Sequence, residues 1–246
     1  MIRSVTYETK VWENDWRNIL IGDYLDRAIA KCNYQFTKKN LIINNVNDKS
    51  LVEEYAKIKV EEGFIDSYYF SDDYANEALK FFDIDVNSFR GGYHYSIAEL
   101  VGIYLCETEY LLHFSSDSYI DKNSDWIDDA IDIMSNNTNI LTANPSWIKE
   151  FITDDVRNNW DWIGENDKFF ITRGFSDQCY LIKVNIVKDK IYNERNPASE
   201  RYPAYGGELF EKRVDAFMMN HNYLRISSKV SNYITKNFPR PDEFTP

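Results

Sequence analysis

The segment Glu109-Tyr-Leu-Leu-His-Phe-Ser-Ser-Asp-Ser118 decides the fold of this chain. Tyr110 to Phe114 is a short, nearly continuous apolar run, which is typical of a strand buried on both faces of a largely parallel sheet. The run ends abruptly in Ser115, Ser116 and Asp117. Because ligands of open α/β sheets bind beyond the carboxyl ends of the strands, Asp117 is a candidate site residue. The alternative is that Asp117 only begins a turn or caps the next element.

Helices are predicted on both sides of this strand. In the segment 92–106, Ile97, Leu100, Val101, Tyr104 and Leu105 have the spacing of a packed helical stripe. Another helix is predicted from Ser124, a possible N-cap, to Asn136, and a strand from Thr138 to Ala143. Helix, buried strand, acidic turn, helix and strand are typical of the middle of a nucleotide-binding α/β domain.

The N-terminal part alternates predicted strands and helices, which indicates a doubly wound half-domain. The helix that follows the second strand begins with the capping box Ser50-Leu-Val-Glu53. The predicted strands are Ser4–Tyr7, Leu41–Val46 and Phe64–Phe70, and the other helices are Leu20–Cys32 and Asp72–Phe82.

The C-terminal part begins at an expected break, Asn144-Pro-Ser-Trp147. Strands are predicted at 169–172, 179–184 and 223–228. Between the last two, Tyr205-Gly-Gly-Glu208 opens a helix on which Glu208, Glu211 and Asp215 share one acidic face. Such a face can carry a catalytic base, or it can simply complement the helix dipole and meet solvent.

Composition limits the classes of function. The chain has 246 residues and a formal net charge of 28 − 40 = −12, which argues against a nucleic-acid partner. No apolar run approaches the ~20 residues of a membrane span, and the first residues lack the apolar core of a signal peptide. The three cysteines, Cys32, Cys106 and Cys179, are odd in number and widely spaced. We therefore expect buried, reduced thiols in a cytoplasmic protein.

The central segment resembles a known family. Tyr110-Leu-Leu-His-Phe-Ser-Ser-Asp117 is similar to the "eYilflDaD" segment of GT-A glycosyltransferases, especially the group that contains the family-2 enzymes. The match continues without a gap back to Ala98–Gly102, where that family has its "aARNxGi" helix. Ser115 stands in place of the first Asp of the family's DxD motif. Glu99 stands where the family often has Arg, and Leu100 where it has Asn.

The resemblance implies a single GT-A domain over residues 1–246. Its central sheet is expected to be mixed, mostly parallel and flanked by helices, with a Rossmann-like N-terminal half. Residues 1–143 would bind the nucleotide sugar, and residues 144–246 would bind the acceptor.

The resemblance also implies an inverting transfer of sugar from a nucleotide-diphosphate donor to a glycan or another hydroxyl acceptor. Asp117 would bind Mn²⁺ or Mg²⁺. Glu208 or Glu211 would be the base that deprotonates the acceptor, and Asp177 is the next candidate. The expected donor-binding residues are Thr6, Tyr7, Asn44, Asp48, His94, Tyr95, Ser115 and Ser116. For Asn44 and Asp48 the alternative is an Asn-rich turn, because these side chains bond their own backbone.

Two other functions remain open from the sequence. A sugar-nucleotidyltransferase would share the nucleotide-binding core, although no glycine-rich first loop is present. A non-catalytic sugar-binding or nucleotide-binding module would explain the missing first carboxylate of the DxD motif.

Overall fold

One mixed β-sheet forms the centre of the computed structural model, which describes residues 3–121, 125–147, 161–236 and 238. β5 (Ser118–Ile120) pairs with β10 beside the main path of the sheet. Along that path the strands are ordered β3 (Ser67–Phe70), β2 (Lys38–Ile43), β1 (Val5–Val11), β4 (Tyr110–Phe114), β9 (Cys179–Lys183), β6 (Ile140–Trp147), β10 (Leu224–Thr235), β8 (Phe169–Thr172) and β7 (Trp162–Glu165).

The N-terminal half is parallel and doubly wound, as the alternation of elements predicts. β3, β2, β1 and β4 are all parallel neighbours, so their carboxyl ends meet at one edge. β9 runs antiparallel between β4 and β6, and β8 and β7 form an antiparallel end of the sheet. The predicted class, an α/β fold with a mixed, mostly parallel sheet flanked by helices, is confirmed.

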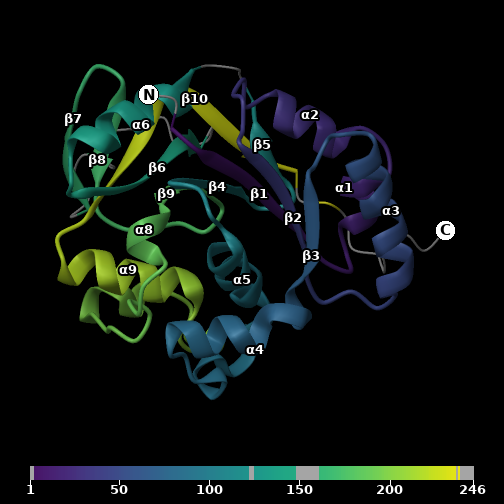
Figure 1. Ribbon diagram of the computed structural model, residues 1–246. Coiled ribbons are helices and arrows are strands. Elements are labelled where there is room, and N and C mark those ends of the chain that lie inside the picture. The colour runs from purple at the N-terminus through teal and green to yellow at the C-terminus, as the bar shows by residue number, and fades with distance from the viewer. Residues whose placement is uncertain (1–2, 122–124, 148–160, 237, 239–246) are drawn as a thin grey trace.

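Helices cover both faces of the sheet (Figure 1). α1 (Trp16–Leu20), α2 (Tyr24–Ala30), α3 (Lys49–Glu61) and α6 (Trp126–Asn136) pack on one face, and α4 (Ser71–Phe82), α5 (Ile97–Leu105), α8 (Val184–Val187) and α9 (Phe210–Asn220) on the other. Successive strand residues alternate between the two cores, because side chains of a strand point to opposite faces. Leu112 thus joins the first core, whereas Leu111 joins the second.

β1 is longer than its sequence predicts. The expected strand ends at Tyr7, but the ladder continues to Val11 because Glu8 and Lys10 find partners on the face under α5. Thr6 and Tyr7 therefore lie in the first half of the strand, away from its carboxyl end. This shift in the strand end changes which residues reach the ligand-binding edge.

Pro145 lies within β6, so the predicted break at residues 144–147 is wrong. Proline lacks an N–H and is tolerated in a sheet where the ladder is irregular. Such an irregularity occurs here, since the pairing of β10 shifts between Ser228, opposite Pro145, and Asn232, opposite Ser146.

Several predicted helix starts move by a few residues. Asp48, not Ser50, caps α3 by accepting a hydrogen bond from the Leu51 N–H at 3.0 Å. The predicted helix 92–106 is divided into the 3₁₀ segment η1 (Val86–Tyr95) and α5. The predicted helix 20–32 contains only α2, and α1 lies before it. The expected N-cap Ser124 lies outside the described residues.

A close backbone contact fixes the start of α9. The 3₁₀ segments η2 (Pro197–Arg201) and η3 (Ala204–Gly206) precede it, and Gly207 follows η3 with φ +65°. A Cβ at Gly207 would collide with the backbone carbonyl of Ser88 in η1. The Glu208 N–H donates to the same Ser88 carbonyl at 2.9 Å. The paired glycines thus let the loop before α9 pack directly on η1.

Two global features complete the fold. Cys32, Cys106 and Cys179 are all buried and unpaired, as predicted. Among the helices of the described ranges, none combines the length and the apolar character needed to cross a bilayer.

Candidate functional site

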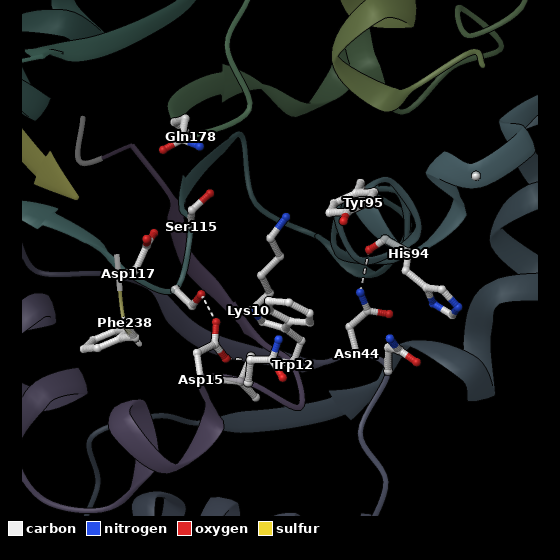
Figure 2. Close-up of a pocket in the computed structure, with 15 residues that line it drawn as sticks. Lys10, Trp12, Asp15, Asn44, His94, Tyr95, Ser115, Asp117, Gln178 and Phe238 are labelled. Atoms are coloured by element: carbon white, nitrogen blue, oxygen red, sulfur yellow. Dashed lines mark hydrogen bonds between the residues drawn. The ribbon is translucent and has the colours of Figure 1, made fainter. Parts of the chain in front are cut away.

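A cavity of about 720 Å³ opens at the carboxyl ends of β1, β2 and β4 (Figure 2). This is the edge at which open α/β sheets bind ligands. It is lined by Lys10, Val11, Trp12, Asn14, Asp15, Asn44, Asn45, Gly91, His94, Tyr95, Ser115, Ser116, Asp117, Gln178 and Phe238. The predicted Asn44, His94, Tyr95, Ser115, Ser116 and Asp117 are therefore brought together.

The turn after β4 is held from two sides. The Ser115 N–H donates to the Gln178 carbonyl at 2.9 Å, and the Ser118 N–H donates to the Ser115 carbonyl at 2.9 Å. The Asp117 carbonyl accepts from the Lys236 N–H at 2.9 Å, which ties the turn to the end of β10. These contacts fix where the Asp117 side chain enters the cavity.

Asp15, which the sequence analysis did not single out, supports the same turn. Its carboxylate accepts hydrogen bonds from the Trp12 N–H at 2.8 Å and from the Ser116 hydroxyl. Burial raises the pKa of Asp15 to about 7, and the nearby Asp117 acts in the same direction. The segment Trp12-Glu-Asn-Asp-Trp16 carries no motif that could identify Asp15 from the sequence.

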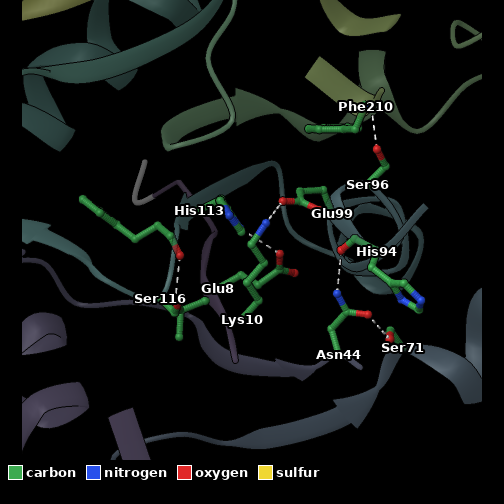
Figure 3. Close-up of polar contacts among 12 residues, drawn as sticks. Glu8, Lys10, Asn44, Ser71, His94, Ser96, Glu99, His113, Ser116 and Phe210 are labelled. Carbon is green, nitrogen blue, oxygen red and sulfur yellow. Dashed lines mark hydrogen bonds and ion pairs between the residues drawn. The ribbon is translucent and has the colours of Figure 1, made fainter. Parts of the chain in front are cut away.

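Lys10 lines the cavity from the end of β1, and its ammonium forms an ion pair with the buried Glu99 of α5. Beside this pair, Glu8 contacts the ring of His113 at 3.1 Å, and both residues are fully enclosed (Figure 3). Burial raises the pKa of Glu8 and lowers that of His113, so both are expected to be neutral. His113 is a core residue, and its Nε2 has no hydrogen-bond partner among the described residues.

Two carboxylates from the second half of the chain, Asp177 and Glu211, influence each other, and Asp177 adjoins a residue that lines the cavity. Asp177 immediately precedes the lining residue Gln178, and burial raises its pKa to about 6 although Lys10 acts in the opposite direction. Burial, reinforced by the charge of Asp177, raises the pKa of Glu211 to about 8. Both side chains are half-buried, so they combine access with a shifted pKa.

Asp215 and Glu208 lie outside this pair. Asp215 is buried and accepts hydrogen bonds from Ser199 at 2.5 Å and Arg201 at 2.8 Å, so it does not lie on a solvent-facing surface of the helix. Glu208 precedes α9 and pairs with Lys212 at 3.2 Å. Of the three acids on the predicted face, only Glu211 interacts with Asp177.

Three expected donor-binding residues, Thr6, Tyr7 and Asp48, do not line this cavity. The Thr6 hydroxyl hydrogen-bonds that of Thr108 at 2.8 Å, and Tyr7 is buried in the core against Phe114. Asp48 is exposed and occupied as the cap of α3. Lys10, Trp12 and Asn45 line the cavity in their place.

Asn44 and His94 line the cavity, but their side chains are poorly placed to contact a ligand in it. Both ends of the Asn44 amide are engaged, donating to the His94 carbonyl at 2.8 Å and accepting from Ser71 at 2.9 Å. The amide thus anchors η1 to the end of β2. The imidazole of His94 points away from Lys10 and Asp117, whereas Tyr95 is exposed beside the cavity (Figure 2).

The carboxylate oxygens at this site could hold a metal ion only together with oxygen atoms of a bound substrate. Among the residues that the structure describes, no group of three or more His, Cys, Asp or Glu side chains is arranged to hold a metal. Both oxygens of Asp15 accept hydrogen bonds that hold the turn, whereas the Asp117 carboxylate lines the cavity directly after β4. Mg²⁺ bound with a nucleotide commonly uses one or two protein carboxylates, phosphate oxygens and water. Asp117 suits that arrangement.

Comparisons with known proteins identify the fold. No protein-family model matches the sequence, and none of the curated proteins matches it. Among solved structures, the chain is similar to glucosyl-3-phosphoglycerate synthase from Mycobacterium tuberculosis in complex with Mn²⁺, UDP and phosphoglyceric acid, with a TM-score of 0.54 and 12% identity over 98% of this chain and 73% of that one.

It is also similar to S. aureus TarS, with a TM-score of 0.52 and 11% identity, covering 94% of this chain but only 36% of TarS. For TarS 1-349 in complex with UDP-GlcNAc the TM-score is 0.52, the identity is 12%, and the coverage is 99% of this chain and 61% of that one. At such identities the similarity concerns the fold alone. The chain has the GT-A fold of nucleotide-sugar glycosyltransferases.

Proposed function

We propose that this protein transfers a sugar from a nucleotide-diphosphate donor to a hydroxyl group of a glycan or another acceptor, with inversion at the sugar carbon. One observation carries the proposal. The Ser115 N–H donates to the Gln178 carbonyl at 2.9 Å, which joins the turn bearing Asp117 to the segment bearing Asp177. A donor diphosphate at the turn would therefore lie beside a carboxylate able to accept a proton.

The donor fits the cavity in size and chemistry. About 720 Å³ is within the range of ligand pockets, which is roughly 300–1,000 Å³. Trp12 and Tyr95 offer aromatic surface for a base or a sugar, and Asn45 offers an amide. The nucleotide-bound structures of glucosyl-3-phosphoglycerate synthase and TarS, which share the fold, support this choice of donor.

Asp117 would hold Mn²⁺ or Mg²⁺ together with the donor diphosphate. When bound, such an ion stabilises the negative charge that develops on the leaving diphosphate. The Ser116 hydroxyl and Asp15 hold the turn in shape, so that the Asp117 carboxylate keeps its position.

The acceptor hydroxyl would lose its proton to Asp177. A general base works best with a pKa near the operating pH, and the pKa of Asp177 is raised to about 6. Glu211, with a pKa of about 8, would mostly be protonated at neutral pH and would hydrogen-bond the acceptor or the Asp177 segment. Glu208 is the weaker candidate because it pairs with Lys212 outside this group. One base without a nucleophilic carboxylate gives single displacement and inversion.

Calorimetric titration with UDP-, GDP- and TDP-linked sugars, with and without Mn²⁺, tests the donor class. We expect one nucleotide series to bind, more tightly with Mn²⁺, and its sugar to be released or transferred. Absence of binding by every series would refute the proposal. Binding without any release or transfer would instead favour the non-catalytic module, which the missing first carboxylate of the DxD motif also suggests.

A further inference from the structure

Lys10 lines the cavity from the end of β1. It is the next-to-last residue of β1, and its side chain extends between Ser115 and Tyr95 (Figure 2). Among the described residues that line the cavity, it is the only lysine or arginine. A diphosphate is a multiply charged anion, and its binding normally requires cationic donors.

A buried carboxylate holds the ammonium in this place. Glu99 is completely enclosed within α5, whereas the Lys10 side chain remains 20% exposed. Apart from this ion pair, the other oxygen of Glu99 has no hydrogen-bond partner among the described residues. Beneath the pair, Gly102 allows Glu8 to approach α5, because a Cβ there would collide with the Glu8 carboxylate. The Lys10 ammonium is thus held by Glu99 while the side chain also lines the cavity (Figure 3).

Lys10 is expected to be protonated and positively charged. Burial alone would lower its pKa, but Glu99, Asp177 and Asp15 together raise the pKa above its ordinary value. An ammonium has three N–H donors, and Glu99 accepts one of them. The protonated lysine lines the cavity, so it can bind an anion there in addition to neutralising Glu99.

We propose that Lys10 binds the diphosphate of the donor, as a protein cation that acts whether or not a metal ion is present. This inference rests on the proposed function and deepens it. Ser115 and Asp117 lie across the cavity from Lys10, so a diphosphate between them would meet the lysine on one side and the turn on the other.

The test compares two variants, because Lys10→Met alone would leave Glu99 buried without a partner and could unfold the protein. The reference is Glu99→Gln, which keeps the lysine charge, and the test variant is Lys10→Met/Glu99→Gln, which removes both charges together. Calorimetry in EDTA measures the affinity of each for UDP, GDP or TDP, whichever binds the wild type, and for the matching nucleoside.

Losing a hydrogen bond to a charged group corresponds to roughly a 10- to 100-fold weaker affinity. We expect the double variant to bind the nucleoside diphosphate weaker than the reference by about this factor, with unchanged affinity for the nucleoside. Equal diphosphate affinity in both variants would overturn the inference, as would an equal loss for nucleoside and diphosphate. A wild type that binds the nucleoside diphosphate only when Mn²⁺ is present would also overturn the inference, whereas no binding with or without Mn²⁺ would refute the proposed function itself.

Discussion

Asp177 is the proposed general base. Because the deprotonated form acts, kcat/KM of the wild type should fall as the pH drops through about 6, the pKa of Asp177. Asp177→Asn should lower kcat by ~10²–10⁴-fold and leave donor affinity nearly unchanged. Glu200→Gln, an exposed carboxylate paired with Lys212, is the matched control. If Glu208→Gln abolishes turnover and Asp177→Asn does not, the base is Glu208.

Asp117 should determine how much a metal ion contributes to donor binding. Changing even an outer-shell neighbour of a metal typically costs about 10–100-fold in metal affinity, so loss of a direct ligand should cost at least as much. Asp117→Asn should therefore remove most of the gain in nucleoside-diphosphate affinity that Mn²⁺ provides, while affinity in EDTA stays close to that of the wild type. An undiminished effect of Mn²⁺ in this variant would show that Asp117 is not a metal ligand.

At the scale of elements, the placement of α9 depends on the contact between Gly207 and η1. Its φ of +65° disfavours other residues, and a Cβ would collide with the Ser88 carbonyl. Gly207→Ala should lower the free energy of unfolding by about 1–3 kcal/mol and, by shifting Glu211, reduce turnover. Gly164→Ala in β7 is the control, since a Cβ there meets nothing within 4 Å. Equal stability of both variants in urea denaturation would contradict this account of α9.

The sequence could predict elements whose pattern is local and apolar. β4 is predicted at its observed bounds, because its nearly continuous apolar run ends at a polar turn. The same turn places Asp117 at the end of the strand. The end of β1 could not be predicted, since Glu8 and Lys10 look like surface residues until α5 supplies Glu99 and β4 supplies His113. Lys10 could not be predicted for this reason, and Thr6 and Tyr7 lie in the first half of β1, away from the cavity.

The candidate base could not be chosen from the sequence for the same reason. Glu208, Glu211 and Asp215 are equivalent by their helical spacing, and only tertiary contacts separate them. Lys212 pairs with Glu208, Arg201 pairs with Asp215, and Glu211 alone lies near Asp177. Partners from distant segments of the chain decide which carboxylate remains available.

At the scale of the whole molecule, the carboxyl groups with raised pKa values should make stability depend on pH. Burial raises the pKa values of Asp15, Asp177 and Glu211 in the folded protein to about 7, 6 and 8, above their ordinary values of 3.8, 3.8 and 4.5. The folded state then binds more protons than the unfolded state between pH ~4 and 8, so the free energy of unfolding falls as pH rises through this window.

We therefore expect a higher melting temperature at pH 5 than at pH 8 in the free protein. Glu211→Gln should raise the melting temperature at pH 8 and change it little at pH 5, because it removes a buried charge that forms only at the higher pH. Scanning calorimetry at the two pH values measures both effects. A melting temperature that increases from pH 5 to pH 8 would contradict the assigned pKa directions.

The cavity draws its turn and Lys10 from the N-terminal half, and the neighbouring acids from the C-terminal half. The most direct test of sugar transfer is time-resolved NMR of the donor's anomeric proton, with the nucleotide sugar that binds most tightly. The wild type should convert the donor to nucleoside diphosphate and a sugar product of inverted configuration, at a rate that Asp177→Asn lowers by ~10²–10⁴-fold. A donor that binds the wild type yet stays intact, with water or with any hydroxyl acceptor supplied, would contradict the account.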